Sequence, residues 1–266
     1  MQHSGHIQKM RTSLDGGDAV YQLPIGDDLV LMNGLVGRRI TLDFNGEICC
    51  ANCGMRTRKS YSQGFCFVCC QSLARCDLCI MKPETCHHHL GTCREPAWGL
   101  DNCFAPHIVY LANSSGIKVG ISRKTNIPSR WIDQGAVEAL ALLEVDTRLK
   151  SGQIEMALKE YVSDKTNWRK MLKNEVEYAD LPTVAPELLG KISGLIDKLG
   201  GKMLDNEVLS INYPVVEYPR KISSLSFDKT PQISGVLQGI KGQYLLLDTG
   251  VLNIRKFGSY HLGLTY

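Results

Sequence analysis

The sequence predicts an α+β protein, with small antiparallel sheets and helices, in which a cysteine-rich segment interrupts regions rich in strands. Three observations predict this class. All 11 cysteines of the 266 residues lie between Cys49 and Cys103. Residues that alternate between apolar and polar character predict strands near both ends of the chain. Apolar residues at helical spacing predict helices in the middle third.

Changes in composition along the chain divide it into five segments. The apolar share of 44% is that of an ordinary globular protein, and 266 residues suffice for two or three small domains. The segments are a β-rich N-terminal segment at 1–48, a cysteine-rich, zinc-binding module at 49–104, an α/β domain at 105–180, a helical connector at 181–210 and a β-rich C-terminal segment at 211–266.

Strand signals dominate both ends. Ile40 and Leu42 alternate with polar residues, and Asn45-Gly46 supplies a turn. Residues 34–43 resemble residues 239–248, each run starting with two glycines three positions apart. Two unrelated glycine-flanked strands explain this similarity more simply than a duplication, because hairpins reuse such residues. A true duplication would let the two ends pair in one sheet or barrel.

Two Cys-x2-Cys pairs have the spacing of a structural zinc site, similar to a zinc ribbon. Cys50 and Cys53 are separated by twelve residues from Cys66 and Cys69, so each pair forms one knuckle and the loop brings the knuckles face to face. Four thiolates leave no open position on zinc, which predicts a structural ion. Clustering in one segment argues against disulfides, because a secreted protein spreads its bridges along the chain.

The remaining cysteines and a histidine are enough for a second zinc ion. Five cysteines compete for four places, and imidazole is also a common ligand. One zinc with free buried thiols is the alternative, and Cys49 and Cys70 are spare in either case. An iron–sulfur cluster requires a redox partner that nothing else in the chain suggests. The preferred set, with its substitutes last, is Cys79, Cys86, Cys93 and Cys103, then Cys76 and His87.

The middle of the chain predicts a hairpin followed by helices. Residues 108–111 and 117–121 are apolar runs separated by Asn-Ser-Ser-Gly, which is typical of two strands joined by a turn. Pro128 occupies the first turn of one helix, and a second helix follows Gly152. A further helix is predicted for 186–199, where two glycines end it.

These elements carry residues whose order resembles the signature of the GIY-YIG nuclease superfamily. The resemblance covers about residues 105–175 and rests on Ile108-Val109-Tyr110, Lys118-Val119-Gly120, Arg130-Trp131, Glu155 and Asn167. It implies a GIY-YIG-like small sheet with helices. It also implies that the arginine contacts phosphate, that the glutamate holds a divalent metal such as magnesium, and that the asparagine supports the site. The chain departs from the pattern at Lys118, where the second motif has tyrosine, and at Gln134, where histidine or tyrosine is expected.

The chain also resembles, over most of its length, an uncharacterised bacterial family, domain of unknown function 2797. No reaction is attached to that family. The resemblance rests on the runs at 76–84, 91–99, 118–123, 130–136 and 164–169.

Charge supports a local rather than a global interaction with nucleic acid. The net charge is only +3, but residues 118–130 and 165–174 contain basic residues and no acidic ones. Arginine forms forked contacts with phosphate and lysine acts as a point charge. The candidate contacts with RNA or DNA are Lys118, Ser122, Arg123, Lys124, Arg130, Arg169 and Lys170.

The favoured hypothesis is therefore a zinc-containing protein that cleaves nucleic acid with the help of magnesium. The alternatives are a non-catalytic RNA- or DNA-binding protein, favoured by Lys118, and a structural zinc adaptor. Without an apolar leader among the first twenty residues, or an apolar stretch near the roughly 20 residues that span a bilayer, we expect a cytoplasmic protein without membrane contact. The candidate catalytic residues are Tyr110, Lys118, Arg130, Glu155 and Asn167.

Overall fold

A computed structural model describes residues 1–266 as a mixed α+β protein with antiparallel sheets. The largest sheet joins the two ends of the chain, because its first strand pairs with its last. In spatial order its strands are β1 (Gln2–His6), β14 (Tyr260–Thr265), β5 (Arg39–Ile48), β11 (Gln232–Lys241), β12 (Tyr244–Leu247) and β13 (Gly250–Asn253).

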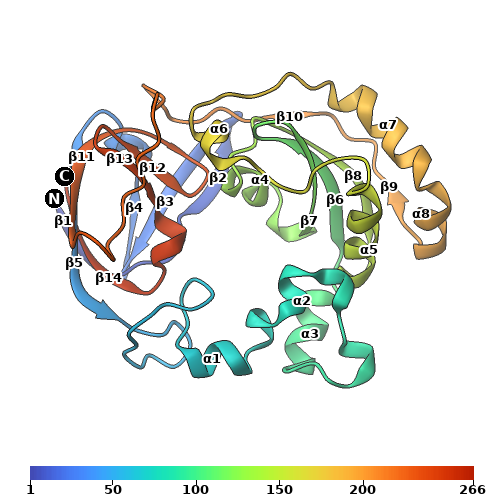
Figure 1. Ribbon diagram of the computed structural model, residues 1–266, viewed down its shortest axis with the longest axis horizontal. Helices are drawn as coiled ribbons and strands as arrows, with labels where there is room; N and C mark the ends of the chain where they lie inside the picture. The colour runs from blue at the N-terminus through green and yellow to red at the C-terminus, as the bar shows by residue number, and fades with distance from the viewer.

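A three-stranded sheet packs against the largest sheet, and together they form what we call the β body (Figure 1). The apolar residues Ile40 and Leu42 of β5 point into its core, as their alternation predicts. The predicted turn at Asn45-Gly46 is wrong. Here β5 continues with a bulge opposite β14, and the Asn45 Oδ1 atom accepts the Glu47 N–H at 2.9 Å. The smaller sheet comprises β2 (Arg11–Asp15), β3 (Asp18–Ile25) and β4 (Asp28–Leu31).

A central sheet forms the second part of the molecule. The predicted hairpin is confirmed, and residues of β6 and β7 face each other along the whole hairpin, with Tyr110 opposite Gly120. In spatial order the sheet contains β10 (Leu209–Ser210), β8 (Glu138–Val145), β6 (His107–Asn113) and β7 (Ile117–Arg123), and β9 (Lys202–Met203) pairs with β8.

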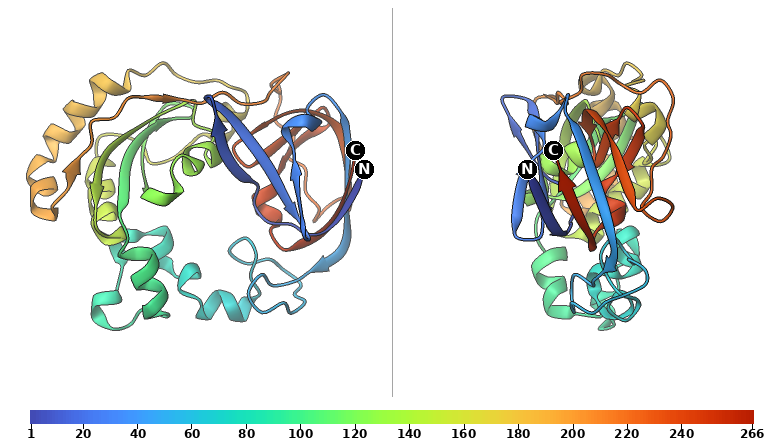
Figure 2. Two further views of the ribbon diagram at one scale, coloured as in Figure 1. Left: turned by 180° about the vertical axis from the view of Figure 1, so that it is seen from behind. Right: turned by 90° about the vertical axis from the view of Figure 1, so that its left-hand side faces the viewer.

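Helices cover both faces of the central sheet. One face packs against α5, α7 and α8 and the other against α4 and the β body (Figure 2). No helix has both the length and the apolar character needed to cross a bilayer. The helices are α1 (Phe67–Ser72), α2 (Leu78–Met81), α3 (Pro96–Cys103), α4 (Ser129–Asp133), α5 (Arg148–Leu158), α6 (Trp168–Leu172), α7 (Leu181–Lys191) and α8 (Ser193–Leu199).

Several predicted boundaries need correction. The α5 helix contains Gly152 rather than following it, because Thr147 caps the helix by accepting the Lys150 N–H. Pro186 lies inside α7 instead of starting a helix, whereas the stop at Gly200 is confirmed by its left-handed conformation. After residue 211, extended strands resume only with β11. Six short 3-10 helices complete the fold: η1 (Asn33–Leu35), η2 (Ala74–Cys76), η3 (Pro83–Thr85), η4 (His88–Leu90), η5 (Lys124–Asn126) and η6 (Ile254–Phe257).

The cysteine module, residues 49–104, extends from the β body to the central sheet (Figure 1). At its far end η3 packs directly on α5. A side chain on Gly152 would place its Cβ atom 2.6 Å from the Pro83 Cβ atom and 2.7 Å from the Glu84 backbone nitrogen. Glycine at this helical position therefore allows the module to dock.

Replacing Gly152 by alanine is expected to lower the free energy of unfolding by about 1–2 kcal/mol, because the clash outweighs the gain in helix propensity. Gly190 of α7 is the matched control, since an added Cβ atom meets nothing within 4 Å. Gly190→Ala should stabilise the protein by up to about 1 kcal/mol. Urea unfolding of both variants measures the difference, and stabilisation by Gly152→Ala would disprove the docking role.

Candidate functional site

Four thiols at the near end of the cysteine module lie in one cluster. The Sγ atoms of Cys50, Cys53, Cys66 and Cys69 are all within 4.8 Å of one another. Zinc–sulfur bonds of about 2.3 Å give a tetrahedron with edges of about 3.8 Å, and the Cys53 and Cys66 sulfurs are 3.8 Å apart. The cluster therefore fits a zinc ion closely, with four sulfur ligands and no open position.

Local structure explains how these cysteines converge. The Cys66 side chain caps α1 by accepting the Cys69 N–H, so one pair spans the start of a helix. The other pair follows β5, where the Gly54 N–H bonds to the Cys50 carbonyl oxygen and closes a tight turn. The Asn52 amide also donates a hydrogen bond to the Cys69 sulfur, at 3.4 Å. This N–H···S bond links the two knuckles and stabilises a thiolate.

A second group of thiols surrounds a small hollow at the far end of the module. Burial and then the charges of Asp77, Cys86, Cys103 and Cys93 raise the pKa of Cys79 to about 11, which places these groups close together. The four cysteines of the preferred second set all line the hollow, together with His87 and His88. The four cysteines come from α2, the end of α3 and the loops between them. Their sulfur atoms do not all lie within 4.8 Å of one another, so the second zinc ion stays a prediction.

The other possible zinc ligands lie at or near the two groups of thiols. His87, Asp77 and Cys79 form a group whose ligand atoms lie within 4.8 Å, so His87 stays an alternative ligand. Cys76 lies beside Cys70, whose sulfur also contacts Ser62 at 3.3 Å. The thiol of Cys49 donates to Glu47 at 3.4 Å, outside both clusters.

Four of the predicted catalytic residues, Tyr110, Lys118, Arg130 and Glu155, lie near one another beside β7, the edge strand of the central sheet. Tyr110 is fully buried under α4, and its hydroxyl accepts a hydrogen bond from Gln134 at 2.6 Å. Lys118 is only 6% exposed. Glu155 extends from α5 and lies 3.7 Å from the Lys159 ammonium. The charge of Arg130 influences the titration of Tyr110, Lys118 and Glu155, so it lies near all three.

Burial weakens the charges of this group. Desolvation and then the Arg130 charge lower the pKa of Lys118 to about 8. Desolvation also raises the pKa of Glu155 and that of Tyr110. The buried tyrosine is thus held as a neutral phenol and has no solvent-exposed hydroxyl with which to activate water.

Asn167 makes two structural hydrogen bonds. Its side chain caps α6 by accepting the Lys170 N–H at 3.2 Å, and its own N–H donates to the Ser115 hydroxyl. Arg169 stacks on Trp168, with its guanidinium carbon 4.3 Å from the ring centre.

Several lysines of the predicted basic runs meet carboxylates from elsewhere in the chain. Lys124 pairs with Glu144 at 2.7 Å, and Lys170 pairs with Glu177 at 2.9 Å. These contacts reduce the positive charge that the two runs present to solvent.

Five arginines line a single hollow of about 330 Å³ between the cysteine module, the central sheet and the β body. No carboxylate lies in its lining, and the arginine that does form an ion pair with a carboxylate, Arg94, lies elsewhere. Burial, and then the charge of Arg130, lower the pKa of Arg255. The guanidiniums therefore create a concentrated positive field, with the carboxylates of Asp133 and Glu155 acting on Arg255 and Arg148 from outside the lining. They belong to Arg75, Arg123, Arg130, Arg148 and Arg255.

The sequence predicts three of the residues that line this hollow. Arg123, Arg130 and Ser122 were candidates for contact with nucleic acid, and all three line it. Arg75, Arg148 and Arg255 were missed, because they lie far apart in the sequence and none belongs to a basic run. Spatial convergence is the signal that identifies them.

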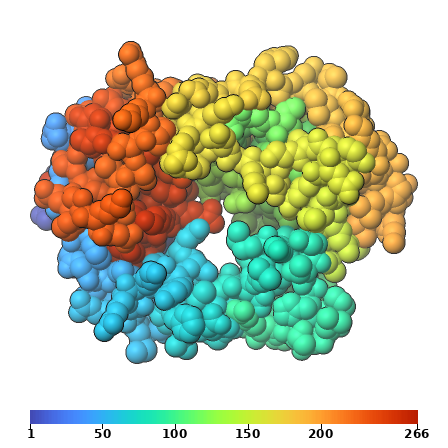
Figure 3. All heavy atoms as spheres, in the orientation of Figure 1, coloured from blue at the N-terminus to red at the C-terminus, as the bar shows by residue number.

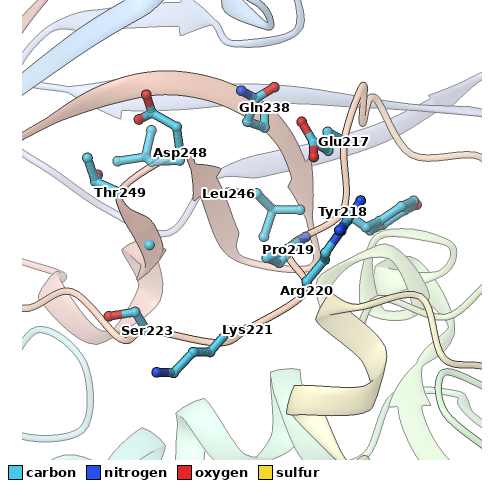
Figure 4. A pocket seen from close by; sticks show the side chains of 12 residues that line it. Glu217, Tyr218, Pro219, Arg220, Lys221, Ser223, Gln238, Leu246, Asp248 and Thr249 are labelled. Carbon is cyan, nitrogen blue, oxygen red and sulfur yellow. The ribbon is translucent and has the colours of Figure 1, made fainter.

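A larger hollow of about 480 Å³ lies on the β body, where the segment before β11 crosses the strands β12 and β13. Figure 4 shows Glu217 and Asp248 on its upper rim and Lys221 and Ser223 on its lower rim. Its charges have both signs, with Arg220 also in the lining. Its lining therefore differs from that of the arginine-lined hollow, in which every charged side chain is a cation.

The fold and the thiol cluster define the class of the protein: an α+β protein with a cysteine cluster suited to a structural metal ion. The family follows from comparison with known proteins. A family model described as protein of unknown function (DUF2797) matches residues 37–262, and the chain belongs to this family. No curated protein and no solved structure matches the chain.

Proposed function

We propose that this protein binds the phosphate backbone of nucleic acid, RNA or DNA, in the arginine-lined hollow, and that two structural zinc ions hold the hollow together. The observation that carries this proposal is the convergence of five arginines without a carboxylate in one hollow. Guanidinium groups bind phosphate oxygens through paired hydrogen bonds, and phosphates are the commonest polyanion that such a field attracts.

Zinc supports this function indirectly. Two of the lining arginines depend on the cysteine module for their position: the Arg148 guanidinium donates to the Ile80 carbonyl oxygen at 2.7 Å and that of Arg123 donates to the Asn102 side-chain oxygen at 2.6 Å. Arg75 belongs to the module itself, between the two thiol clusters. A segment of this size has too little core to fold alone, so metal binding supplies the folding free energy.

Cleavage of the bound strand is a second candidate function. It is favoured by the group of Tyr110, Lys118, Arg130 and Glu155, since Arg130 belongs both to this group and to the hollow. In that reaction Arg130 would stabilise the phosphate, and Glu155 would hold a magnesium ion. The complete burial of Tyr110 favours binding over cleavage.

Binding is tested by fluorescence anisotropy with labelled single-stranded RNA and DNA. We expect affinity to fall steeply between about 50 and 200 mM salt. The double variant Arg75→Gln/Arg130→Gln should bind at least about tenfold more weakly, with a salt slope smaller by about 1.4, because each phosphate contact on a single strand contributes about 0.7. The matched control is Arg38→Gln/Arg39→Gln, which removes the same charge from exposed positions on the β body. Equal weakening in both variants would indicate only general attraction.

The same samples with added magnesium separate the two candidates. If the protein only binds, the strand stays intact with wild type and with Glu155→Gln. Magnesium-dependent products made by wild type and by the exposed control Glu160→Gln, but absent with Glu155→Gln, would establish cleavage instead. Retained binding in a chelator that spares the zinc would confirm that magnesium is not needed for affinity.

A further inference from the structure

The protein forms a closed ring, in which the cysteine module completes the circle between the β body and the central sheet. At the near end the Ser60 hydroxyl donates to the Gly258 carbonyl oxygen at 2.9 Å, and the Ser259 hydroxyl donates to the Gly64 carbonyl oxygen at 2.8 Å. Arg255 also bonds to Gln63. These contacts join the two knuckles of the Cys50, Cys53, Cys66 and Cys69 cluster to the β body.

The other junctions of the ring are equally direct. Within the module the Arg94 guanidinium bridges the two halves by donating to the Cys70 carbonyl oxygen and pairing with Asp77. The β body meets the central sheet at Asp133 of α4, which accepts hydrogen bonds from Thr12 at 3.1 Å and Gln243 at 2.8 Å. The far end of the module is held on α5 at Gly152.

An opening passes through the ring. Figure 3 shows a gap through the space-filling molecule, bounded by the cysteine module below and on the right, the β body on the left and the central sheet above. The arginine-lined hollow draws its residues from these same three parts. The five arginines therefore come from all three parts that bound the opening, and not from a single face of one part.

We propose that a single strand of nucleic acid occupies this opening and enters it by a free end. This proposal rests on the proposed function and specifies its substrate. A hollow of about 330 Å³ has room for a short segment of one strand. A sphere of that volume is only about 9 Å across, which is too narrow for a duplex, because a duplex is wider than its own major groove of about 12 Å. A closed ring admits a strand without breaking its junctions only if the strand has an end to thread.

The lining suits a single strand chemically. Arginines on different sides of the opening contact successive phosphates whatever the base sequence. Trp98 of α3 also lines the hollow and offers an aromatic face for a base, while Asn102 and Asn126 offer amides. No acidic side chain in the lining repels the backbone. Recognition of this kind is independent of sequence and sensitive to the shape and ends of the strand.

The test uses the zinc-loaded full chain and three single-stranded DNA probes of identical central sequence. One probe is linear, one is a covalently closed circle, and one is linear with a stable hairpin at each end. Competition against a labelled linear strand measures their affinities. We expect the circle and the double hairpin to bind at least about tenfold more weakly than the linear probe.

Each outcome has a defined meaning. Equal binding of all three probes, lost in Arg75→Gln/Arg130→Gln, would overturn threading and leave the proposed function intact. Absence of binding to every probe and to single-stranded RNA would overturn the proposed function itself. Weak binding of the circle together with tight binding of the double hairpin would also contradict threading, because the hairpins block the ends as effectively as circularisation does.

Discussion

Cys66→Ser is expected to release one zinc ion and to unfold the near end of the cysteine module. Serine caps a helix at least as well as cysteine, so the α1 cap survives and the loss is that of a metal ligand. Structural zinc contributes about 10–16 kcal/mol to the folding of small modules, and its loss should lower the melting temperature by about 10 °C or more. Zinc content measured by atomic emission, with thermal melting, checks both effects.

Cys49→Ser provides the control for this experiment. Cys49 is the neighbour of a ligand, but its thiol bonds to Glu47 outside the cluster. The control should keep the zinc content and the melting temperature of the wild type. Equal zinc content in the two variants would show that Cys66 is not a ligand. Because the first knuckles close the ring, Cys66→Ser should also reduce the preference for linear over circular strands.

Lys118→Met is expected to raise the free energy of unfolding by about 1–3 kcal/mol at about pH 7, because wild type holds a charged ammonium in a nearly closed site. Burial lowers the pKa of Lys118 from 10.5 to about 8 in the folded protein. Between these values the unfolded chain binds the additional proton, so wild-type stability rises with pH across the window. The advantage of the variant should therefore shrink from about pH 8 towards pH 10.5.

Urea unfolding at several pH values measures this effect. Lys124→Met is the control, because the Lys124 side chain is 62% exposed and its substitution should change stability by less than about 0.5 kcal/mol. Destabilisation by Lys118→Met at neutral pH would mean that Glu155 and Asp164, the opposing charges near Lys118, compensate the burial. If Lys118→Met stabilises the protein but weakens its binding to the strand, Lys118 is present for function and not for stability.

The sequence was informative wherever the determinants are local. The spacing of Cys50, Cys53, Cys66 and Cys69 predicts their cluster, because each pair is a short knuckle whose geometry depends on four residues. The hairpin of β6 and β7 is predicted for the same reason. The five-segment division and the catalytic roles remain predictions.

The remaining features depend on contacts between distant segments. Gly152 looks like a helix breaker in the sequence, yet it lies inside α5 because the module packs there. Asn45-Gly46 has the composition of a turn, but two neighbouring strands hold it within β5. The arginine-lined hollow joins Arg75 to Arg255, and no local pattern marks residues so far apart as neighbours.

The pairing of strands from opposite ends of the chain also sets an order on folding. β1 pairs with β14, and β5 lies between β14 and β11. Neither early strand can pair in this sheet until partners about two hundred residues later in the chain have been synthesised. The β6–β7 hairpin and the zinc knuckles are made of residues that are close in the sequence, so they can form without the C-terminal strands. We therefore expect them to form first during synthesis, while the edges of β1 and β5 stay unpaired and open to aggregation or chaperones until the last strand arrives.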